Sequence, residues 1–345
     1  MKFCFFTDVH WCQNSSIVRS RGTRYSTRLE NLIDSVNWVE NLSLQTGCDF
    51  VVCGGDFFDS IQLNSEEISS LKEIKWNGLP HYFIIGNHEA SNSSLEFSTL
   101  DVFSLCQNSI VYSKPDCLIF SGVEICFLPF ITERNRQPLE TYFPAYNTQS
   151  KKRIIISHND LKDVQYGRFL STEGFTLEEI DKNCDLFLNG HIHHCQWVND
   201  KVLNGGNLTG QNFTEDYLKD KHCVQIIDSD AMTIDFYENP FALNFMKISV
   251  QNSKQLDDLI SKLICKNIVI TATVPEELVS YTKECLDKIS VSYRVLVDSS
   301  NVKQLTTSAQ AEFKGIDHLQ QFKEYVKENF GDSKICNEEL QEILR

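Results

Sequence analysis

The sequence has no long hydrophobic run. None of its apolar stretches approaches the roughly 20 residues that a membrane-spanning helix requires. The apolar run after Met1 is also too short for the central segment of a secretory signal peptide. We therefore expect a cytoplasmic protein that makes no membrane contact.

Positive charge is scarce too, with 32 Lys and Arg against 47 Asp and Glu and a net charge of −15. Overall charge therefore does not hold this protein on nucleic acid. DNA is still possible as a substrate, because metal ions can neutralise an acidic site and a local basic patch can contact phosphate. Arg19, Arg21, Arg24 and Arg28 form one candidate DNA-binding patch. The alternative is an ordinary solvated face.

Cys-x-x-Cys pairs are absent, although the chain has 13 cysteines. Several of them, such as Cys4, Cys53, Cys126 and Cys223, lie in apolar runs typical of strands, where a thiol packs as a small hydrophobic side chain. We expect buried free thiols rather than a disulfide framework or a zinc knot.

Short apolar runs alternate with helical patterns over the first two thirds of the chain. Strands are predicted over residues 3–6, 50–53, 82–85, 125–130, 154–156, 186–188 and 224–227. Amphipathic helices are predicted over residues 29–39, 66–74 and 95–105. This order predicts a layered α/β domain over residues 1–240.

The pattern changes after residue 240. Residues 241–298 predict a small strand-helix-strand-helix-strand domain, followed by a polar linker and by helices within residues 309–345. The first of these helices carries an apolar stripe, formed by Ile316, Leu319, Phe322, Tyr325, Val326 and Phe330. The stripe either packs on its own chain or docks another protein, and the polar linker before it favours docking.

Five polar clusters each follow an apolar strand. They are FTDVH with Asp8 and His10, VCGGDFFD with Asp56 and Asp59, IIGNHE with Asn87, His88 and Glu89, IISHND with His158, and LNGHIHH with His191 and His193. In layered α/β sheets, ligands bind outside the carboxyl ends of the strands. A mixture of imidazole nitrogen with carboxylate and amide oxygen suits Mn²⁺, Fe²⁺ or Zn²⁺ better than Mg²⁺ or Ca²⁺. Seven side chains of these clusters are candidate ligands: Asp8, His10, Asp56, Asn87, His158, His191 and His193. Seven ligands are too many for one tetrahedral ion, so we expect two ions that share a carboxylate.

As an ordered set, these motifs resemble the calcineurin-like metallophosphoesterase superfamily. GNHE is similar to the serine/threonine phosphatases, but the Gly after the first Asp-x-His and the Asp-Arg-Gly of those enzymes are missing. GGDFFD resembles the SbcD-type DNA repair and recombination nucleases, and the short chain is closer to phage-encoded members. Glu89, where SbcD proteins more often have Asp, and the absence of Pro from NGGN are departures.

The resemblance implies a fold, a metal centre and partners. The fold is a four-layer αββα sandwich, followed by a small α/β capping domain and C-terminal helices. Asp8, His10 and His193 would hold one metal ion, Asn87, His158 and His191 the other, and Asp56 would bridge them. Mn²⁺ is the expected metal. The partners would be DNA, an SbcC-type ATPase subunit and a second copy of the chain, paired through helices near residues 66–74 and 95–105.

The remaining residues of the motifs have less specific roles. The resemblance makes His88 a catalytic residue that does not bind metal, placed near the scissile phosphate. Asp59 and Glu89 are candidates to orient the ligands, although Glu89 fits equally well as a charge at a helix N-terminus. His194 matches no ligand of the family, and a surface histidine with a hydrogen-bond partner is the simpler interpretation.

The leading hypothesis is a DNA nuclease subunit with 3′→5′ exonuclease and endonuclease activity. One alternative is a phosphodiesterase or phosphatase of small substrates on the same metal core. The other is a non-catalytic, metal-bearing scaffold for DNA ends. The complete ligand set argues against the scaffold, and the extra C-terminal residues argue against the small-substrate enzyme.

Overall fold

The computed structural model describes residues 1–13, 24–90, 95–105, 108–143, 152–166, 169–216, 220–262, 267–289 and 291–298. By its internal contacts the chain divides into two units, Met1–Asp298 and Ser299–Arg345. The second unit, with the predicted helices of residues 309–345 and their apolar stripe, lies outside the described residues.

Two six-stranded sheets form the first part of the chain. In the first sheet the order is β14 (Thr233–Glu238), β13 (Cys223–Asp228), β1 (Lys2–Phe6), β2 (Phe50–Cys53), β3 (His81–Ile84) and β4 (Ser109–Tyr112). Strands β1 to β4 run parallel, and β13 lies antiparallel to β1.

The second sheet has a similar construction. Its order is β11 (Gln196–Trp197), β12 (Val202–Asn204), β10 (Leu186–Asn189), β7 (Lys152–Ser157), β6 (Val123–Leu128) and β5 (Asp116–Phe120). Strands β6, β7, β10 and β12 run parallel, so their carboxyl ends meet at one edge, as those of β1 to β4 do.

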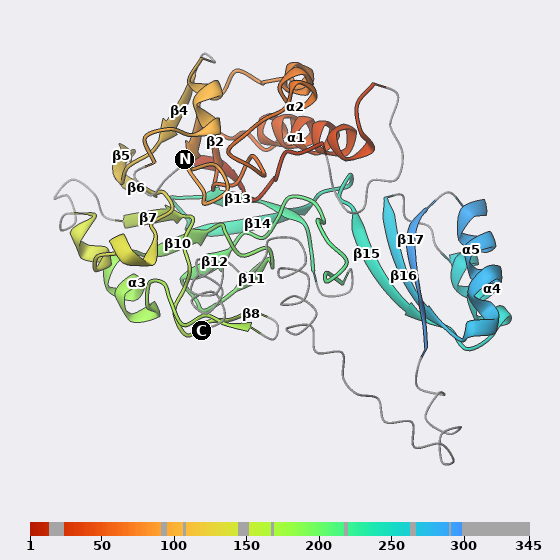
Figure 1. Ribbon diagram of the computed structural model, residues 1–345. Helices are drawn as coiled ribbons and strands as arrows, with labels where there is room; N and C mark the ends of the chain where they lie inside the picture. The colour runs from red at the N-terminus through yellow and green to blue at the C-terminus, as the bar shows by residue number, and fades with distance from the viewer. Residues whose placement is uncertain are drawn as a thin grey trace, which may run out of the picture. The chain divides into compact units, whose positions relative to one another are not determined.

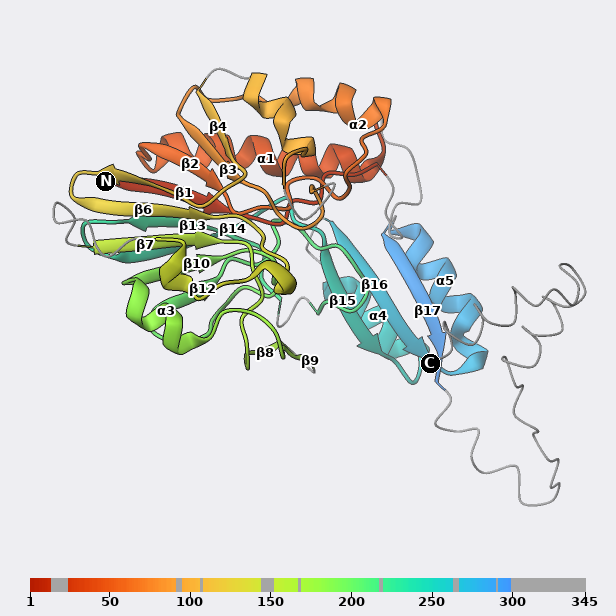
Figure 2. The ribbon, with the colours of Figure 1, turned by 60° about the vertical axis from the view of Figure 1, so that its left-hand side comes forward.

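Successive side chains of each strand point to opposite faces of the sheet, and this alternation builds a layered core. Phe3 and Phe5 belong to the core between the sheets, while Cys4 and Phe6 pack on the outer side with α1 (Thr27–Gln45). Helices α1 and α2 (Ser65–Ser70) cover the first sheet, and α3 (Leu177–Asn183) covers the second (Figure 1 and Figure 2). The predicted αββα sandwich is confirmed.

All three predicted helices differ in length or type, and the one predicted over residues 29–39 is longer, as α1 (Thr27–Gln45). The helix predicted over residues 66–74 is α2 followed by the 3₁₀ turn η1 (Leu71–Glu73). Residues 95–105 contain the 3₁₀ helix η2 (Thr99–Leu105) instead of an α-helix. Further 3₁₀ turns are η3 (Glu133–Asn135) and η4 (Leu139–Thr141). Among the helices of the described ranges, none combines the length and apolarity needed to cross a membrane.

A three-stranded parallel sheet follows the sandwich in the sequence. Its elements are β15 (Asn244–Ser249), α4 (Ser253–Lys262), β16 (Ile268–Val274), η5 (Glu276–Leu278), α5 (Val279–Lys288) and β17 (Ser292–Val297). Their order matches the strand-helix-strand-helix-strand pattern, and both helices pack on one face of the sheet through Leu256 and Leu286 (Figure 2). The domain boundaries at residues 240 and 241 stay a prediction.

One cysteine departs from expectation. Cys126 forms a disulfide with Cys117, because the antiparallel pairing of β5 and β6 places these two residues opposite each other. Cys4, Cys53 and Cys223 are buried and free, as predicted.

Candidate metal centre

The strands carry the predicted polar residues to one edge of the sandwich. Asp8 and His10 follow β1, Asp56 and Asp59 follow β2, Asn87 follows β3, His158 follows β7, and His191 and His193 follow β10. Three groups of these side chains lie close enough together to hold metal ions. The order of strands in the sheets is therefore what gathers residues that are far apart in the sequence.

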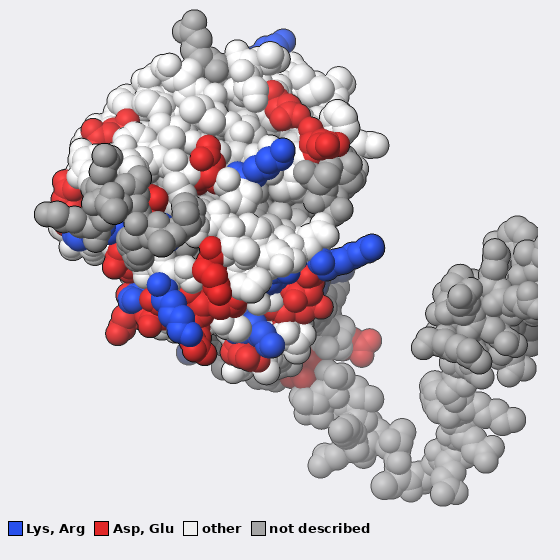
Figure 3. Space-filling view, turned by 90° about the vertical axis from the view of Figure 1, so that its left-hand side faces the viewer, with Lys and Arg blue, Asp and Glu red and all other residues white. Residues whose placement is uncertain are grey.

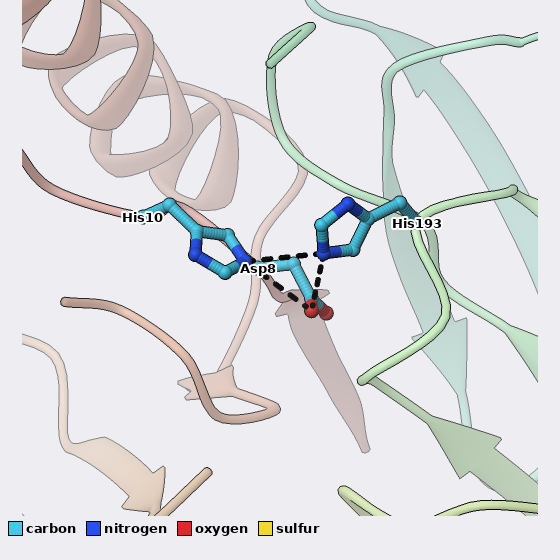
Figure 4. A group of neighbouring side chains, drawn as sticks. All are labelled: Asp8, His10 and His193. Carbon is cyan, nitrogen blue, oxygen red and sulfur yellow. Dashed lines mark hydrogen bonds and ion pairs between the residues drawn. The ribbon is translucent and has the colours of Figure 1, made fainter. Parts of the chain in front are cut away.

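The first group consists of Asp8, His10 and His193 (Figure 4). The Nε2 atoms of His10 and His193 lie 3.1 Å apart, at 3.8 Å and 3.6 Å from Oδ1 of Asp8. Oδ1 of Asp8 is buried and has no hydrogen-bond partner, whereas Oδ2 accepts hydrogen bonds from Thr7 Oγ1 at 2.6 Å and from the His191 backbone N–H at 3.0 Å. A buried carboxylate oxygen without a donor, facing two imidazole nitrogens, fits a divalent cation.

The second group contains Asp56, His158 and His191, with Asn87 between the two imidazoles. Oδ1 of Asn87 lies 3.1 Å from Nε2 of His158 and 2.9 Å from Nδ1 of His191. Oδ2 of Asp56 lies 3.2 Å from Nε2 of His158. These atoms form a second set of mixed nitrogen and oxygen donors.

Asp56 belongs to both sides of the centre. Its Oδ2 atom lies 3.9 Å from Nε2 of His10 in the first group, and a third group joins His10, Asp56 and His88. The imidazole charge of His158 and its hydrogen bond outweigh burial and lower the pKa of Asp56 below its usual range. An ionised carboxylate between two donor sets is the arrangement that a bridging ligand requires.

The backbone around the centre is strained. Asp8, His10, Asp56 and His191 have φ angles of 53°, 49°, 49° and 71°, in the left-handed region that non-glycine residues rarely occupy. Strain of this kind concentrates at functional sites, where the surrounding structure maintains it. Gly86 is required for close approach, because a Cβ atom there would lie 2.1 Å from Oδ1 of Asp56.

Asp59 and Glu89 support the centre in different ways. Oδ1 of Asp59 lies 2.9 Å from Nδ1 of His10, and this hydrogen bond, with the nearby charges of Asp56 and Asp8, overcomes the effect of burial and raises the pKa of His10 to about 10. Glu89 is buried and accepts backbone hydrogen bonds from Asp56, Phe58 and Gly86. Residues 87–89 form a turn, so the alternative of a helix charge does not apply to Glu89.

His88 lies at the open side of the centre. Its side chain is 41% exposed, its Nδ1 atom lies 2.9 Å from the carbonyl oxygen of Asp59, and its Nε2 atom lies 4.0 Å from Oδ2 of Asp56. It is the most exposed of the imidazoles around Asp56, which leaves it accessible to a substrate.

The predicted arginine patch is only partly described, and the expectation of one exposed face is wrong for Arg28. This residue is buried, and its Nη1 atom donates to the carbonyl oxygen of Gly210 at 2.9 Å. Arg24 is exposed and pairs with Glu73, whereas Arg19 and Arg21 lie outside the described residues. On the face shown in Figure 3, Lys and Arg are scattered among carboxylates and form no continuous basic surface.

His193 is one of the residues that line a cavity of about 970 Å³. His194 also lines it, and its Nδ1 atom lies 2.7 Å from Oδ1 of Asp220. His194 is therefore a histidine with a hydrogen-bond partner, as we expected. The lining also includes Glu215 and Asp216, and the one lysine among its described residues, Lys247, donates to the carbonyl oxygen of Thr214. This wall of the cavity, as far as it is described, is acidic.

Sequence reasoning missed Asp160. Its Oδ1 atom lies 3.3 Å from Nε2 of His191, and the hydrogen bond to that imidazole lowers the pKa of Asp160. Its position within the motif SHND was the available signal, because a carboxylate beside a strand-end histidine is close to the metal centre.

Comparison with known proteins agrees with this geometry. The model of the family described as calcineurin-like phosphoesterase matches residues 1–227. The chain belongs to this family. Calcineurin-like phosphoesterases use a binuclear divalent metal centre, which the residue groups described above can hold, and membership supports a phosphoesterase activity.

The individual relatives are distant. Over 180 residues the chain is 21% identical to protein 078R of Invertebrate iridescent virus 3, which is named as a phosphoesterase, covering 48% of this chain and 49% of the relative. Over 271 residues it is 21% identical to the DNA double-strand break repair protein Mre11 of Saccharolobus solfataricus, covering 74% of this chain and 66% of the relative. The chain thus spans about half to two thirds of these curated relatives.

Similarity to solved structures is also low. The crystal structure of TT1561 of Thermus thermophilus has a TM-score of 0.41 and 11% identity, with coverage of 69% of this chain and 98% of that chain.

Proposed function

We propose that the protein is an SbcD-like nuclease subunit that hydrolyses DNA phosphodiester bonds with two divalent ions, as a 3′→5′ exonuclease and endonuclease. The observation that carries the proposal is the pair of nitrogen and oxygen donor groups joined by Asp56, which belongs to the second group and lies 3.9 Å from Nε2 of His10 in the first. Similarity to an Mre11 protein over 74% of the chain supports DNA as the substrate.

In this proposal Asp8, His10 and His193 hold one ion, and Asp56 bridges it to the other. The buried, unpartnered Oδ1 atom of Asp8 supports the first assignment. Asn87, His158 and His191 complete the second site, where Oδ1 of Asn87 lies within about 3 Å of both imidazoles. The mixed donor set favours Mn²⁺ over Mg²⁺. Two bound ions would polarise the scissile phosphate and activate the attacking water.

His88 is assigned to the departing 3′ oxygen. The carbonyl oxygen of Asp59 accepts a hydrogen bond from Nδ1 of His88, which fixes the ring and leaves Nε2 directed towards the shared carboxylate. A protonated imidazole there donates to the oxygen that gains negative charge as the bond breaks. Asp59 and Glu89 keep His10 and the backbone of Asp56 in place.

We also propose an SbcC-type ATPase and a second copy of the chain as partners, in DNA recombination, repair and replication. The apolar stripe within residues 309–345 is the candidate ATPase-docking segment. The polar linker before this segment favours docking of the stripe on a partner over packing on its own chain.

A phosphodiesterase of small substrates is the second candidate. The cavity beside His193 favours it, because Asp216 and Asp220 repel a long polyanion on that side. A nucleotide-sized substrate has fewer charges to place there.

One assay separates these candidates. Purified protein with Mn²⁺ is incubated with double-stranded DNA, single-stranded DNA and bis-p-nitrophenyl phosphate, with Asp56→Ala as the control. The nuclease proposal expects cleavage of DNA and of the small ester, lost together in the control. Cleavage of the small ester alone supports the second candidate, and cleavage of none with metal bound supports the scaffold.

A further inference from the structure

His191 presents its two ring nitrogens to different partners. Nδ1 faces the centre, 2.9 Å from Oδ1 of Asn87, while Nε2 faces away from it, 3.3 Å from Oδ1 of Asp160. The backbone N–H of His191 donates to Asp8 at 3.0 Å, which fixes the start of the side chain. The ring is thus held at both ends.

The other ligand imidazoles show that the orientation of His191 is reversed. His10 and His158 both direct Nε2 into the centre. Nδ1 of His10 lies 2.9 Å from Oδ1 of Asp59, and Nδ1 of His158 lies 2.7 Å from the Gly54 carbonyl oxygen. His191 directs Nδ1 inward. A neutral imidazole carries a single ring proton, and the partner that accepts this proton decides which nitrogen is free for a metal ion.

Asp160 has a fixed place in the fold. The Phe175 backbone N–H donates to the Asp160 carbonyl oxygen at 3.0 Å, and the Lys162 N–H donates to the Phe175 carbonyl oxygen at 2.9 Å. Gly174, with φ of +115°, makes this approach possible, because a Cβ atom there would lie 2.2 Å from the Asp160 carbonyl oxygen. The backbone of Asp160 is therefore anchored by a second loop, and its place beside the ring does not depend on His191.

We propose that Asp160 is a positioning residue that holds the Nε2 proton of His191 and so leaves Nδ1 free to bind the second metal ion. Asp160 faces the nitrogen on the far side of the ring and belongs to none of the metal-type groups found among the described residues. It acts on the metal only through His191. The inference rests on the metal assignment within the proposed function and is independent of whether DNA is cleaved.

The test measures metal binding directly. Full-length wild type, Asp160→Ala and Asp160→Asn are titrated with Mn²⁺ in competition with a chelator. Asp163→Asn is the matched control, because Asp163 is exposed, lies in the same loop and has a φ of 60° that Asn tolerates. We expect one of the two ions to bind about 10- to 100-fold more weakly in Asp160→Ala, with a smaller loss in Asp160→Asn, which keeps an acceptor oxygen. The other ion and the control should be unchanged.

A second readout distinguishes positioning from a structural role. The ¹⁵N resonances of His191, assigned by their loss in His191→Gln, should report an Nε2–H tautomer in the metal-free wild type and a mixture of tautomers in Asp160→Ala. The melting temperature of the metal-free protein should not change. Unaltered metal affinity with an unaltered tautomer overturns the proposal, and so does an equal loss of both ions with a lower melting temperature. Two ions bound without DNA cleavage by the wild type would overturn only the nuclease function.

Discussion

The carboxylate of Asp56 contacts His88 at two points. Oδ1 accepts a hydrogen bond from the backbone N–H of His88 at 3.0 Å, and Oδ2 lies 4.0 Å from Nε2 of the same residue. The residue that connects the two donor groups therefore also fixes the main chain of the exposed histidine. This couples the place of His88 to the place of the two donor groups.

Replacement of His88 by Gln should slow phosphodiester cleavage by roughly 10²–10⁴-fold, the range expected for loss of a positioned acid. Both metal ions should remain, because Gln keeps the backbone bond to Asp56. Elemental analysis tests the metal content, and cleavage of DNA tests the rate, because a 3′ oxygen needs a proton to leave whereas p-nitrophenolate does not. His194→Gln is the control, since its ring is tied to Asp220 and we assign it no role. If His88→Gln loses an ion along with its activity, His88 is a ligand.

Replacement of Asp56 by Ala should remove bound metal and all hydrolysis, because each ion loses a shared ligand. His193→Ala should weaken one ion more than the other, since His193 belongs to the first group alone. Metal content by elemental analysis, at matched free Mn²⁺, checks both variants. Two tightly bound ions in Asp56→Ala would exclude the bridging role.

The metal-free protein should lose stability as the pH rises above neutrality. The hydrogen bond to Asp59 and the charges of Asp56 and Asp8 raise the pKa of His10 from 6.5 to about 10. The charged form of His10 therefore stabilises the folded state below pH 6.5, and this stability is lost as the pH rises towards 10. The slope of the free energy of unfolding from this group is up to about 1.4 kcal/mol per pH unit. Burial lowers the pKa of His193 to about 4, which acts in the opposite sense but only between pH 4 and 6.5.

Thermal unfolding with a chelator at pH 6.5 and pH 9 measures this effect. The melting temperature should be lower at pH 9, and His10→Gln should reduce the difference. A melting temperature that rises or stays constant across this interval would contradict the assignment. Excess Mn²⁺ should reverse the trend, because an ion binds the deprotonated ring.

The strand-end residues could be predicted because two simple signals coincide in them. An apolar run such as Phe50–Cys53 identifies a buried strand, and the polar residues that follow it must lie at the edge where parallel strands end. The predicted residues Asp56 and His158 therefore meet, although the sequence does not show the order of strands that brings β2 and β7 to the same place.

The remaining features depend on contacts between distant segments. Arg28 is buried because the loop at Gly210 covers the start of α1, which no local pattern in the helix indicates. The disulfide of Cys117 and Cys126 follows from the register of β5 with β6, and β5 was not predicted. Asp160 reaches His191 through the crossover that joins β7 to β10.

The last prediction concerns residues 309–345, where the sequence places six apolar side chains on one face of a predicted helix and Asp317, Gln321, Glu324, Lys327 and Glu328 on the other. Such a face needs a covering surface, and we assign it to the ATPase partner. Deletion of residues 309–345 should leave Mn²⁺ binding and the nuclease activity of the isolated subunit nearly intact, because the metal-type groups found in the described part of the chain lie within residues 1–193. It should abolish co-purification with the ATPase and any stimulation by ATP. Ile316→Ser with Phe322→Ser should reproduce both losses in the full-length chain, whereas Gln321→Ser on the polar face should not. A truncated protein that aggregates, or that melts at a lower temperature, would assign the stripe to the core of this chain.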